Sequence, residues 1–298
     1  MIYRSTRDLD FSLEDVPSCP TPRRVLMTTP DRFEVTYVIN PHMAGNIGGV
    51  NTTRAIAHWA ALRSTYDRLG IDVHIVDGLD NLPDMVFCAN QTLPFIRKAD
   101  PSKPGIVLSK MFADQRKQEV VAYAEFFKSL GFETLPFGEV AETSFEGMGD
   151  AIWHPSRYLI WGGYGFRTDA SVYDLIAEEL DVKIMLIELT DPDFYHLDTC
   201  LSVLDEHTAL IYPGAYNQDG LDLIRAFFPN VIESPEDESR TLFSCNAHCP
   251  DGKHVIIQRG CNETNKMLKA AGFIPIEVDT SEFLKAGGSV FCMKQMFW

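Results

Sequence analysis

The stretch EFLKAGGSVFCM, residues 282–293, places a lone cysteine, Cys292, behind a glycine pair at the end of a strand-like run. A buried cysteine usually behaves as a small hydrophobic side chain. A nucleophilic cysteine would need a general base and an orienting carboxylate elsewhere in the chain. The search for these partners reveals a repeat that extends over most of the sequence.

Three kinds of segment alternate along the chain. Amphipathic stretches with helical spacing and a stop signal predict helices at 51–70, 114–131, 169–181, 219–229 and 262–272. Each is followed by a short β-rich run, at 71–78, 132–138, 182–190, 231–235 and 273–279. A second predicted strand with conspicuous polar residues then follows, at 85–93, 145–153, 195–204, 242–250 and 287–293.

One position recurs in these second strands, at intervals of 46 to 56 residues. It is occupied in turn by Asn90, Glu146, Asp198, Asn246 and Cys292. Clusters of Gly, Pro and Asp after this position predict hairpin turns at 99–105, 154–158, 205–208 and 249–254. Such units cannot bury their apolar faces alone. We therefore expect an α/β fold, a five-fold pseudosymmetric α/β propeller of strand-helix-strand-hairpin repeats that brings the five polar residues to one central point.

The first unit needs strands from the amino-terminal part of the chain, and residues 23–29 and 35–41 have the required β-rich character. No low-complexity linker follows. We expect a single catalytic domain from residue 23 to 298, preceded by a polar amino-terminal extension, residues 1–22, of unknown role.

Composition excludes several classes of partner. The net charge is -16 and no Lys/Arg-rich block appears, which argues against nucleic acid. No run approaches the apolar length of about 18 residues that a membrane span needs, and the first residues lack a signal-peptide core. We expect a cytoplasmic protein whose seven cysteines are free thiols. The oligomeric state does not follow from the sequence.

The predicted convergence assembles groups with complementary chemistry. A cysteine thiolate attacks an electrophilic carbon, and a histidine protonates the leaving amine and then activates water. Two carboxylates can hold a planar guanidinium by charge-assisted hydrogen bonds. Taken singly, the histidine or the FEGMGD turn has an ordinary structural explanation, and only the shared position favours a site. Its candidate members are Asn90, Glu146, Asp150, His196, Asp198 and Cys292.

The motifs around these residues resemble a known superfamily. They are YVINPHMAGN, DMVFCANQ, FEGMGDAIW, GYGFRTD, FYHLDTCLSVL, YPGAY, FSCNA and EFLKAGGSVFCM. They look like those of the guanidine-modifying, or pentein, superfamily, which includes arginine deiminases, dimethylarginine dimethylaminohydrolases, amidinotransferases and arginine dihydrolases. The resemblance is strongest to the catalytic domain of cyanobacterial-type arginine dihydrolases and covers nearly everything from residue 23 onward.

The resemblance implies roles for individual residues. Cys292 would form a covalent amidino-thioether with the guanidinium carbon, and His196 would act as general acid and then as general base. Glu146 and Asp198 would hold the guanidinium nitrogens. The residues expected to bind the rest of the substrate are Asn90, Asn40, Arg167 and Asp150.

Arg167, Asn40 and Asn90 have specific expected roles among these binding residues. Arg167 would pair with the substrate α-carboxylate, although it could be a surface arginine near a helix start. Asn40 and Asn90 would line the pocket, where the alternative is turn chemistry. Deiminases and dimethylarginine hydrolases usually carry aspartate at the position of Asn90, whereas the dihydrolases carry a neutral side chain.

The expected function is therefore cofactor-free, metal-free hydrolysis of arginine to ornithine, two ammonia and carbon dioxide, with a small molecule as the only partner. Alternatives are a dimethylarginine dimethylaminohydrolase or a deiminase that gives citrulline, and, in another class, a non-catalytic pentein binding protein. Two further motifs carry less weight. The spacing of Cys245, His248, Cys249 and His254 is not a standard zinc pattern. The stretch GNIGGV lacks the P-loop lysine and suits a flexible loop over the substrate.

Overall fold

The computed structural model describes residues 1–135 and 143–298. All five predicted helices are present: α1 (Thr52–Arg68), α2 (Glu119–Ser129), α4 (Val172–Leu180), α5 (Gln218–Phe227) and α7 (Asn262–Ala270). Shorter helices in the described residues are α3 (Gly147–Asp150), α6 (Glu236–Leu242) and α8 (Ser281–Leu284). No helix of the described part combines the length and the apolar character needed to cross a bilayer.

The described strands form five small sheets. In the second, third and fourth of them a hairpin is followed by a helix and a parallel strand, and the first and fifth are variants of this order. The first sheet joins the two ends of the chain, because β15 (Gln295–Phe297) pairs antiparallel with β2 (Arg24–Thr28), which pairs parallel with β3 (Asp72–Val76). The second contains β4 (Thr92–Ile96), β5 (Pro104–Leu108) and β6 (Glu133–Leu135).

The remaining sheets repeat this pattern. The third contains β7 (Ala151–Trp153), β8 (Leu159–Tyr164) and β9 (Lys183–Glu188). The fourth contains β10 (Leu201–Val203), β11 (Thr208–Ile211) and β12 (Asn230–Glu233). The fifth contains β13 (His254–Gln258) and β14 (Ile274–Val278), with a bridge from His248 to Ile256 in place of the first strand.

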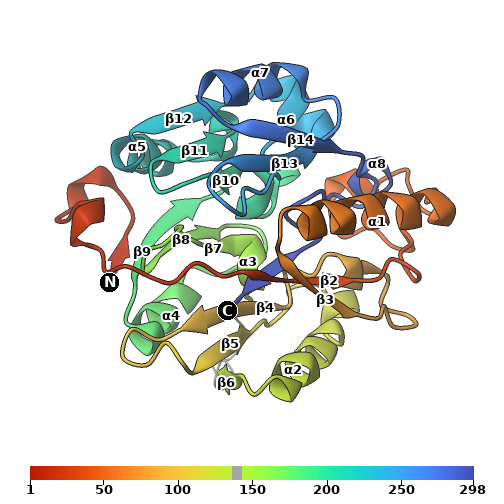
Figure 1. Cartoon of the computed structure of the whole chain (residues 1–298), viewed down its shortest axis with the longest axis horizontal. Coiled ribbons are helices and arrows are strands. Elements are labelled where there is room, and N and C mark those ends of the chain that lie inside the picture. Colours follow the sequence, from red (N-terminus) through yellow and green to blue (C-terminus); the bar gives the residue numbers. More distant parts are fainter. Residues whose placement is uncertain (136–142) are drawn as a thin grey trace.

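Figure 1 shows the five sheets grouped around α3, with α1, α2, α4, α5 and α7 towards the outside. The central strands β2, β5, β8, β11 and β13 are mostly buried, whereas the outer parallel strands β3, β6, β12 and β14 are mostly half-buried or exposed. The main hydrophobic cluster includes Trp161, whose ring stacks on Phe228 at a centroid distance of 4.8 Å. A smaller cluster around Phe127 and Phe297 packs under the second sheet and the carboxyl-terminal strand.

Two sequence predictions about strands are wrong. The recurring polar residues do not lie on strands: Asn90 and Cys292 lie in turns just before β4 and β15, and Asp198 lies in a 3-10 turn before β10. Along a strand, successive side chains point to opposite faces of the sheet, whereas a turn is free to direct its side chains to one point. Residues 35–41 form no strand either, since Asn40 accepts hydrogen bonds from the two backbone amides that open the 3-10 turn Pro41–Met43. Of the run 132–138, residues 136–138 lie outside the described residues.

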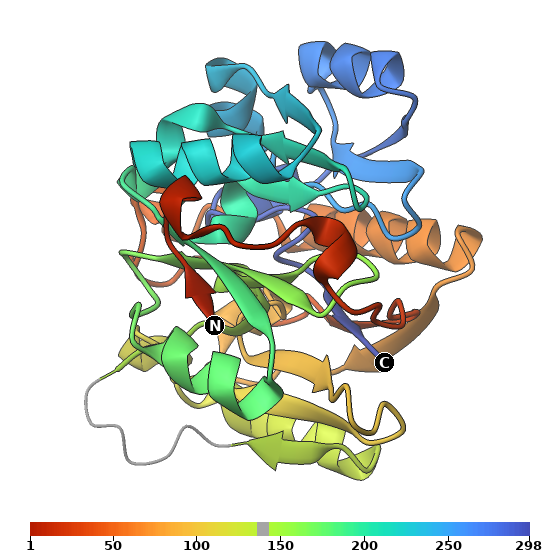
Figure 2. The same cartoon turned by 90° about the vertical axis from the view of Figure 1, so that its left-hand side faces the viewer.

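The amino-terminal extension packs on the third sheet (Figure 2). Strand β1 (Ile2–Tyr3) pairs parallel with β9 and so adds a fourth strand that the sequence did not predict. Further along, the backbone amide of Cys19 donates to the carbonyl of Ser156, and that of Tyr158 donates to Pro17. These bonds place residues 17–23 beside the β7–β8 hairpin.

Candidate active site

Cys292 contacts two of the other recurring residues, Asp198 and Asn246. Its thiol donates to Asp198 Oδ2 at 3.1 Å, and Asn246 Nδ2 donates to its Sγ at 3.2 Å. The backbone amide of Cys292 donates to Asn246 Oδ1 at 3.3 Å. Asn246 therefore fixes both the side chain and the backbone of the cysteine. The recurring register already contained Asn246, although we did not predict it as a site residue.

Burial and a neighbouring carboxylate keep this cysteine protonated at rest. The thiol is 3% exposed, and burial, followed by the charge of Asp198, raises the pKa of Cys292 well above its usual value. Burial also raises the pKa of Asp198 to about 7. Its Oδ1 has no hydrogen-bond partner among the described residues, so the carboxyl retains one free oxygen.

Glu146 is surrounded by hydrogen-bonding partners. His196 Nε2 lies 2.7 Å from Glu146 Oε2, and Arg167 Nη1 lies 3.3 Å from the same oxygen. The backbone amide of Phe112 donates to the other oxygen at 3.0 Å. Burial alone would raise the pKa of Glu146, but the hydrogen bond with His196 and the charge of Arg167 outweigh it and lower the pKa to about 2. Glu146 is thus ionised, and in this structure it orients His196.

Asp150 supports the histidine from a second side. Its Oδ1 accepts from the backbone amide of Leu197 at 2.9 Å, and its Oδ2 accepts from Thr168 Oγ1 at 2.7 Å. The distance from Asp150 Oδ2 to His196 Nε2 is 3.9 Å. Burial raises the pKa of Asp150 to about 6. These bonds fix the backbone next to His196 and leave little capacity for substrate.

Asn90 is oriented by an arginine that the sequence did not reveal. Arg116 Nη1 donates to Asn90 Oδ1 at 2.9 Å, and the same guanidinium binds both oxygens of Glu119. The amide nitrogen Nδ2 of Asn90 is buried and has no partner among the described residues. A Cβ atom on Gly149 would lie 2.3 Å from this nitrogen, so only glycine leaves room for the Asn90 amide there.

A small cavity is lined by Cys292, His196, Asn90 and Arg116, whereas Glu146, Asp150 and Asp198 are not among its lining residues. It also contains Asp84, which we did not single out within DMVFCANQ. Tyr37 donates to Asp84 Oδ2 at 2.9 Å, Oδ1 has no partner in the described part, and burial raises the pKa of this carboxyl. The lining residues are Ile39, Asn40, Met43, Asp84, Phe87, Asn90, Arg116, Arg167, Tyr195, His196, Ala286, Gly287 and Cys292.

The structure brings every predicted site residue to this region but gives some of them other partners. Asn40 Oδ1 accepts the backbone hydrogen bonds that open the turn at Pro41–Met43. Asn40 Nδ2 donates to the carbonyl of Ala286 at 3.0 Å. Arg167 donates to the carbonyl of Ile39 at 2.6 Å, and its guanidinium carbon lies 4.8 Å from the centroid of the Tyr195 ring. Pairing of Arg167 with a substrate carboxylate remains a prediction. Within residues 1–135 and 143–298, no group of three or more His, Cys, Asp and Glu side chains is arranged for a metal ion.

Comparison with known proteins gives the family. The family model for eukaryotic N,N-dimethylarginine dimethylhydrolases matches residues 41–297. The chain belongs to this family. It is 38% identical to the N(G),N(G)-dimethylarginine dimethylaminohydrolase of Mycobacterium tuberculosis over 92% of this chain and 85% of that protein.

Cyanobacterial proteins are also similar. The bifunctional arginine dihydrolase/ornithine cyclodeaminase ArgZ of Synechocystis is 34% identical over 91% of this chain, and the match covers 37% of ArgZ. The crystal structure of a mutant ArgZ amino-terminal domain bound to substrate superposes with a TM-score of 0.85 at 32% identity, covering 92% of this chain and 97% of that one. The predicted superfamily and the mixed α/β fold of its structures are confirmed. The chain is an enzyme of the hydrolase class that acts on guanidino C–N bonds, so the alternative of a non-catalytic binding protein is set aside.

Proposed function

We propose that the chain hydrolyses the guanidinium group of arginine through Cys292 and carries the reaction on to ornithine, two ammonia and carbon dioxide. The observation that carries the choice of reaction is the orientation of the Asn90 amide by Arg116. In the same proposal, the five sheets close into a propeller, residues 23–298 form its single domain, and the enzyme works in the cytoplasm.

The first step uses the Asp198 side of the site. A guanidinium placed against the free oxygen of Asp198 brings positive charge next to a buried thiol. That charge opposes the burial and the neighbouring carboxylate that hold the Cys292 pKa high. The thiol then gives its proton to Asp198 Oδ2, which accepts its hydrogen bond at 3.1 Å, and the thiolate attacks the guanidinium carbon. Substrate binding thus generates the nucleophile.

The second step uses the Glu146 side. A proton delivered from His196 allows the amino group to leave as ammonia, and a covalent amidino-thioether remains on Cys292. Glu146, ionised and 2.7 Å from His196 Nε2, stabilises the protonated imidazole and fixes its orientation. The same histidine then takes a proton from water, which adds to the intermediate and releases citrulline. Arg167 supports Glu146 with a second charge.

In this proposal, the Asn90 amide keeps citrulline bound in the active site for a second reaction. Arginine side chains only donate hydrogen bonds, so the Asn90 atom that faces Arg116 is its oxygen and the free atom is the Nδ2 donor. A donor can bind the carbonyl oxygen of citrulline, whereas an aspartate would oppose that oxygen with a second acceptor. Retained citrulline undergoes a second attack by Cys292, which expels ammonia and leaves a carbamoyl thioester on the cysteine. A second water hydrolyses this thioester, which frees the thiol, and the resulting carbamate loses carbon dioxide to leave ornithine.

Asp84 completes the proposed recognition. Arginine carries two cationic groups, and two buried carboxyls of this region have an unpartnered oxygen in the described residues: Asp84, which lines the cavity, and Asp198, which contacts the lining residue Cys292. Asp198 lies beside the nucleophile, which leaves Asp84 for the α-ammonium group. Arg167, which lines the same cavity, would bind the α-carboxylate.

A second candidate is hydrolysis of N(G),N(G)-dimethylarginine to citrulline. It is favoured by the matching family model and by the Mycobacterium tuberculosis relative. Product analysis separates the two. Purified enzyme given arginine should release two ammonia for each ornithine and accumulate little citrulline. If the enzyme instead forms one citrulline for each arginine and cannot consume it, the chain is a deiminase. Turnover of dimethylarginine but not of arginine would establish the second candidate.

A further inference from the structure

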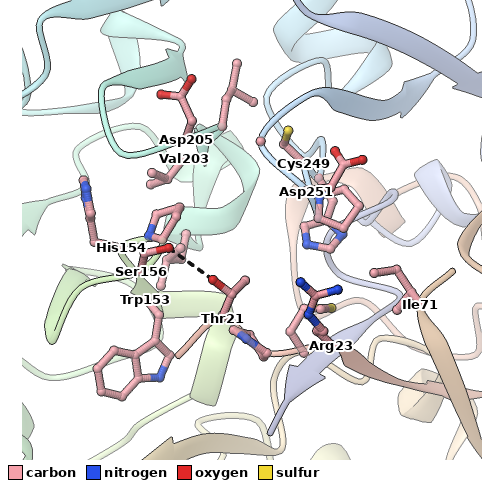
Figure 3. A pocket seen from close by; sticks show the side chains of 18 of the residues that line it. Thr21, Arg23, Ile71, Trp153, His154, Ser156, Val203, Asp205, Cys249 and Asp251 are labelled. Atoms are coloured by element: carbon pink, nitrogen blue, oxygen red, sulfur yellow. Dashed lines mark hydrogen bonds between the residues drawn. The ribbon is translucent and has the colours of Figure 1, made fainter. Parts of the chain in front are cut away.

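A second and larger cavity lies at the other end of the strands from the active site, with a volume of about 580 Å³ (Figure 3). The active-site residues precede the first strand of each hairpin, whereas this cavity is lined by the hairpin turns that follow those strands, at 153–156, 203–207 and 248–252. Residues 19–23 and the carboxyl-terminal segment complete its wall. None of its lining residues lines the cavity at Cys292.

Lys294 is a buried, unpaired cation in this wall. It is 1% exposed, and within the described part of the chain its ammonium forms no hydrogen bond or ion pair. Its Nζ lies 3.2 Å from the centroid of the Phe291 ring, which also lines the cavity. Burial lowers the pKa of Lys294 to about 7, and the charge of Asp198 only partly offsets this. A buried ammonium without an acceptor is costly, so Lys294 gives up its proton readily and would keep it when an anion reaches the group.

The other charged side chains in the cavity wall are three carboxylates and Arg23. Two of the carboxylates face a basic side chain, since Arg157 binds Glu206 at 2.7 Å and His254 lies 2.7 Å from Asp251, and Asp205 accepts from the backbone amide of His207 at 2.8 Å. Arg23, by contrast, is exposed and has no ion pair in the described residues. Figure 3 shows its guanidinium directed into the cavity.

We propose that this cavity is a second binding site, which takes a small organic anion by pairing its carboxylate or phosphate group with the Lys294 ammonium. The rest of the ligand would extend towards Arg23 at the mouth. The volume falls within the range of about 300–1,000 Å³ usual for small-molecule sites. Lys294 lies two residues after Cys292, so an anion bound there contacts the segment that carries the nucleophile. The inference stands independently of which guanidine the enzyme hydrolyses.

The test is calorimetric titration of the full chain after alkylation of Cys292 with 2-chloroacetamidine, which blocks the active site. Inorganic phosphate, glucose 6-phosphate and citrate serve as probes that separate phosphate from carboxylate recognition. We expect one molecule of at least one organic probe to bind per chain. Lys294→Met, which keeps the apolar stem, should weaken binding about tenfold or more, because a charge-assisted hydrogen bond is lost.

Two further variants make the result decisive. Arg23→Gln changes only an exposed side chain and should weaken binding about threefold, so the site is tested even if Lys294→Met folds poorly. Lys128→Met, at a lysine whose side chain is 74% exposed, is the matched control and should bind like the wild type. The proposal is overturned if none of the probes binds, or if Lys294→Met and Arg23→Gln both bind as tightly as Lys128→Met.

Discussion

Glu146 and Asp198 are two fully buried carboxyls in one active site, yet their acidities move in opposite directions. Glu146 faces His196 and Arg167, and its pKa falls to about 2. Asp198 contacts a neutral thiol, and its pKa rises to about 7 because burial outweighs the opposing charge of Lys294. Burial is therefore overcome only where the carboxyl also has close side-chain donors, as Glu146 has in His196 and Arg167. The difference divides the site into an ionised half that orients the histidine and a half that waits for a cationic substrate.

The largest effect is expected from removing the nucleophile on the Asp198 side. Cys292→Ser should lower ammonia release by about 1,000-fold or more, because a hydroxyl is far less readily ionised than a thiol. The measurement is initial ammonia release from arginine, with the fold checked by circular dichroism. The matched control is Cys88→Ser, at a buried cysteine outside the site, which should retain most activity. Alkylation by 2-chloroacetamidine at Cys88 or Cys200 in place of Cys292 would argue against this assignment.

The next largest effect should come from the ionised half. Glu146→Gln removes the negative charge beside His196 and Arg167, which orients the histidine, and should lower kcat by about 100-fold, equivalent to about 2.7 kcal/mol in the activation barrier. Steady-state kinetics of the variant provide the measurement. Glu125→Gln, at a glutamate whose side chain is 69% exposed, should be unaffected. Equal losses in the two variants would show that Glu146 has no special part in the reaction.

Asn90→Asp should change the product rather than abolish turnover. Arg116, which already donates to this side chain, can pair with the new carboxylate, so the fold should tolerate it. The donor that binds the citrulline oxygen is lost, and we expect the ratio of citrulline to ornithine to rise about tenfold or more. Chromatographic separation of the two amino acids measures it. An unchanged ratio, in a variant that remains active, would remove Asn90 from the choice of product.

The smallest effects are expected on the free energy of unfolding. At pH 8 the charges of Asp198 and Glu146 should contribute to it with opposite signs. The unfolded pKa of an aspartate is about 3.9. Because the folded pKa of Asp198 is higher, its contribution to stability falls as pH rises from about 4 through 7 and stays unfavourable above that range. Asp198→Asn should therefore be more stable than the wild type at pH 8, by about 2–4 kcal/mol, but not at pH 4.

Glu146 provides the opposite sign in the same experiment. Its lowered pKa stabilises the fold above the unfolded value of about 4.3, and this contribution is lost as pH falls towards 2. Glu146→Gln should accordingly be less stable than the wild type at pH 8. Urea unfolding at both pH values measures the two variants together. If both destabilise the protein equally at pH 8, the contrast between the two halves of the site is wrong.

The sequence by itself determined the repeat and the positions of its helices. Helix periodicity depends on local spacing, and the amphipathic stretches became α1, α2, α4, α5 and α7 because each buries one apolar face against neighbouring strands, which for α5 include β9 of the third sheet as well as β12. The recurrence of Asn90, Glu146, Asp198, Asn246 and Cys292 identified the centre, since equivalent positions of repeated units share an environment. The register also contained Asn246, whose contact with Cys292 could have been inferred from that position.

Tertiary structure alone decided how these groups are paired. Asn90 and Arg116 are 26 residues apart on separate segments, and no local pattern indicates that one orients the other. Glu146 could have held the substrate directly, and only the placement of His196 and Arg167 around it makes it an orienting carboxylate. Hydrogen bonds and charge pairs depend on distances of a few ångströms between distant segments. Residue type and spacing specify which chemistry is available, and the packing of the units specifies which partner each group meets.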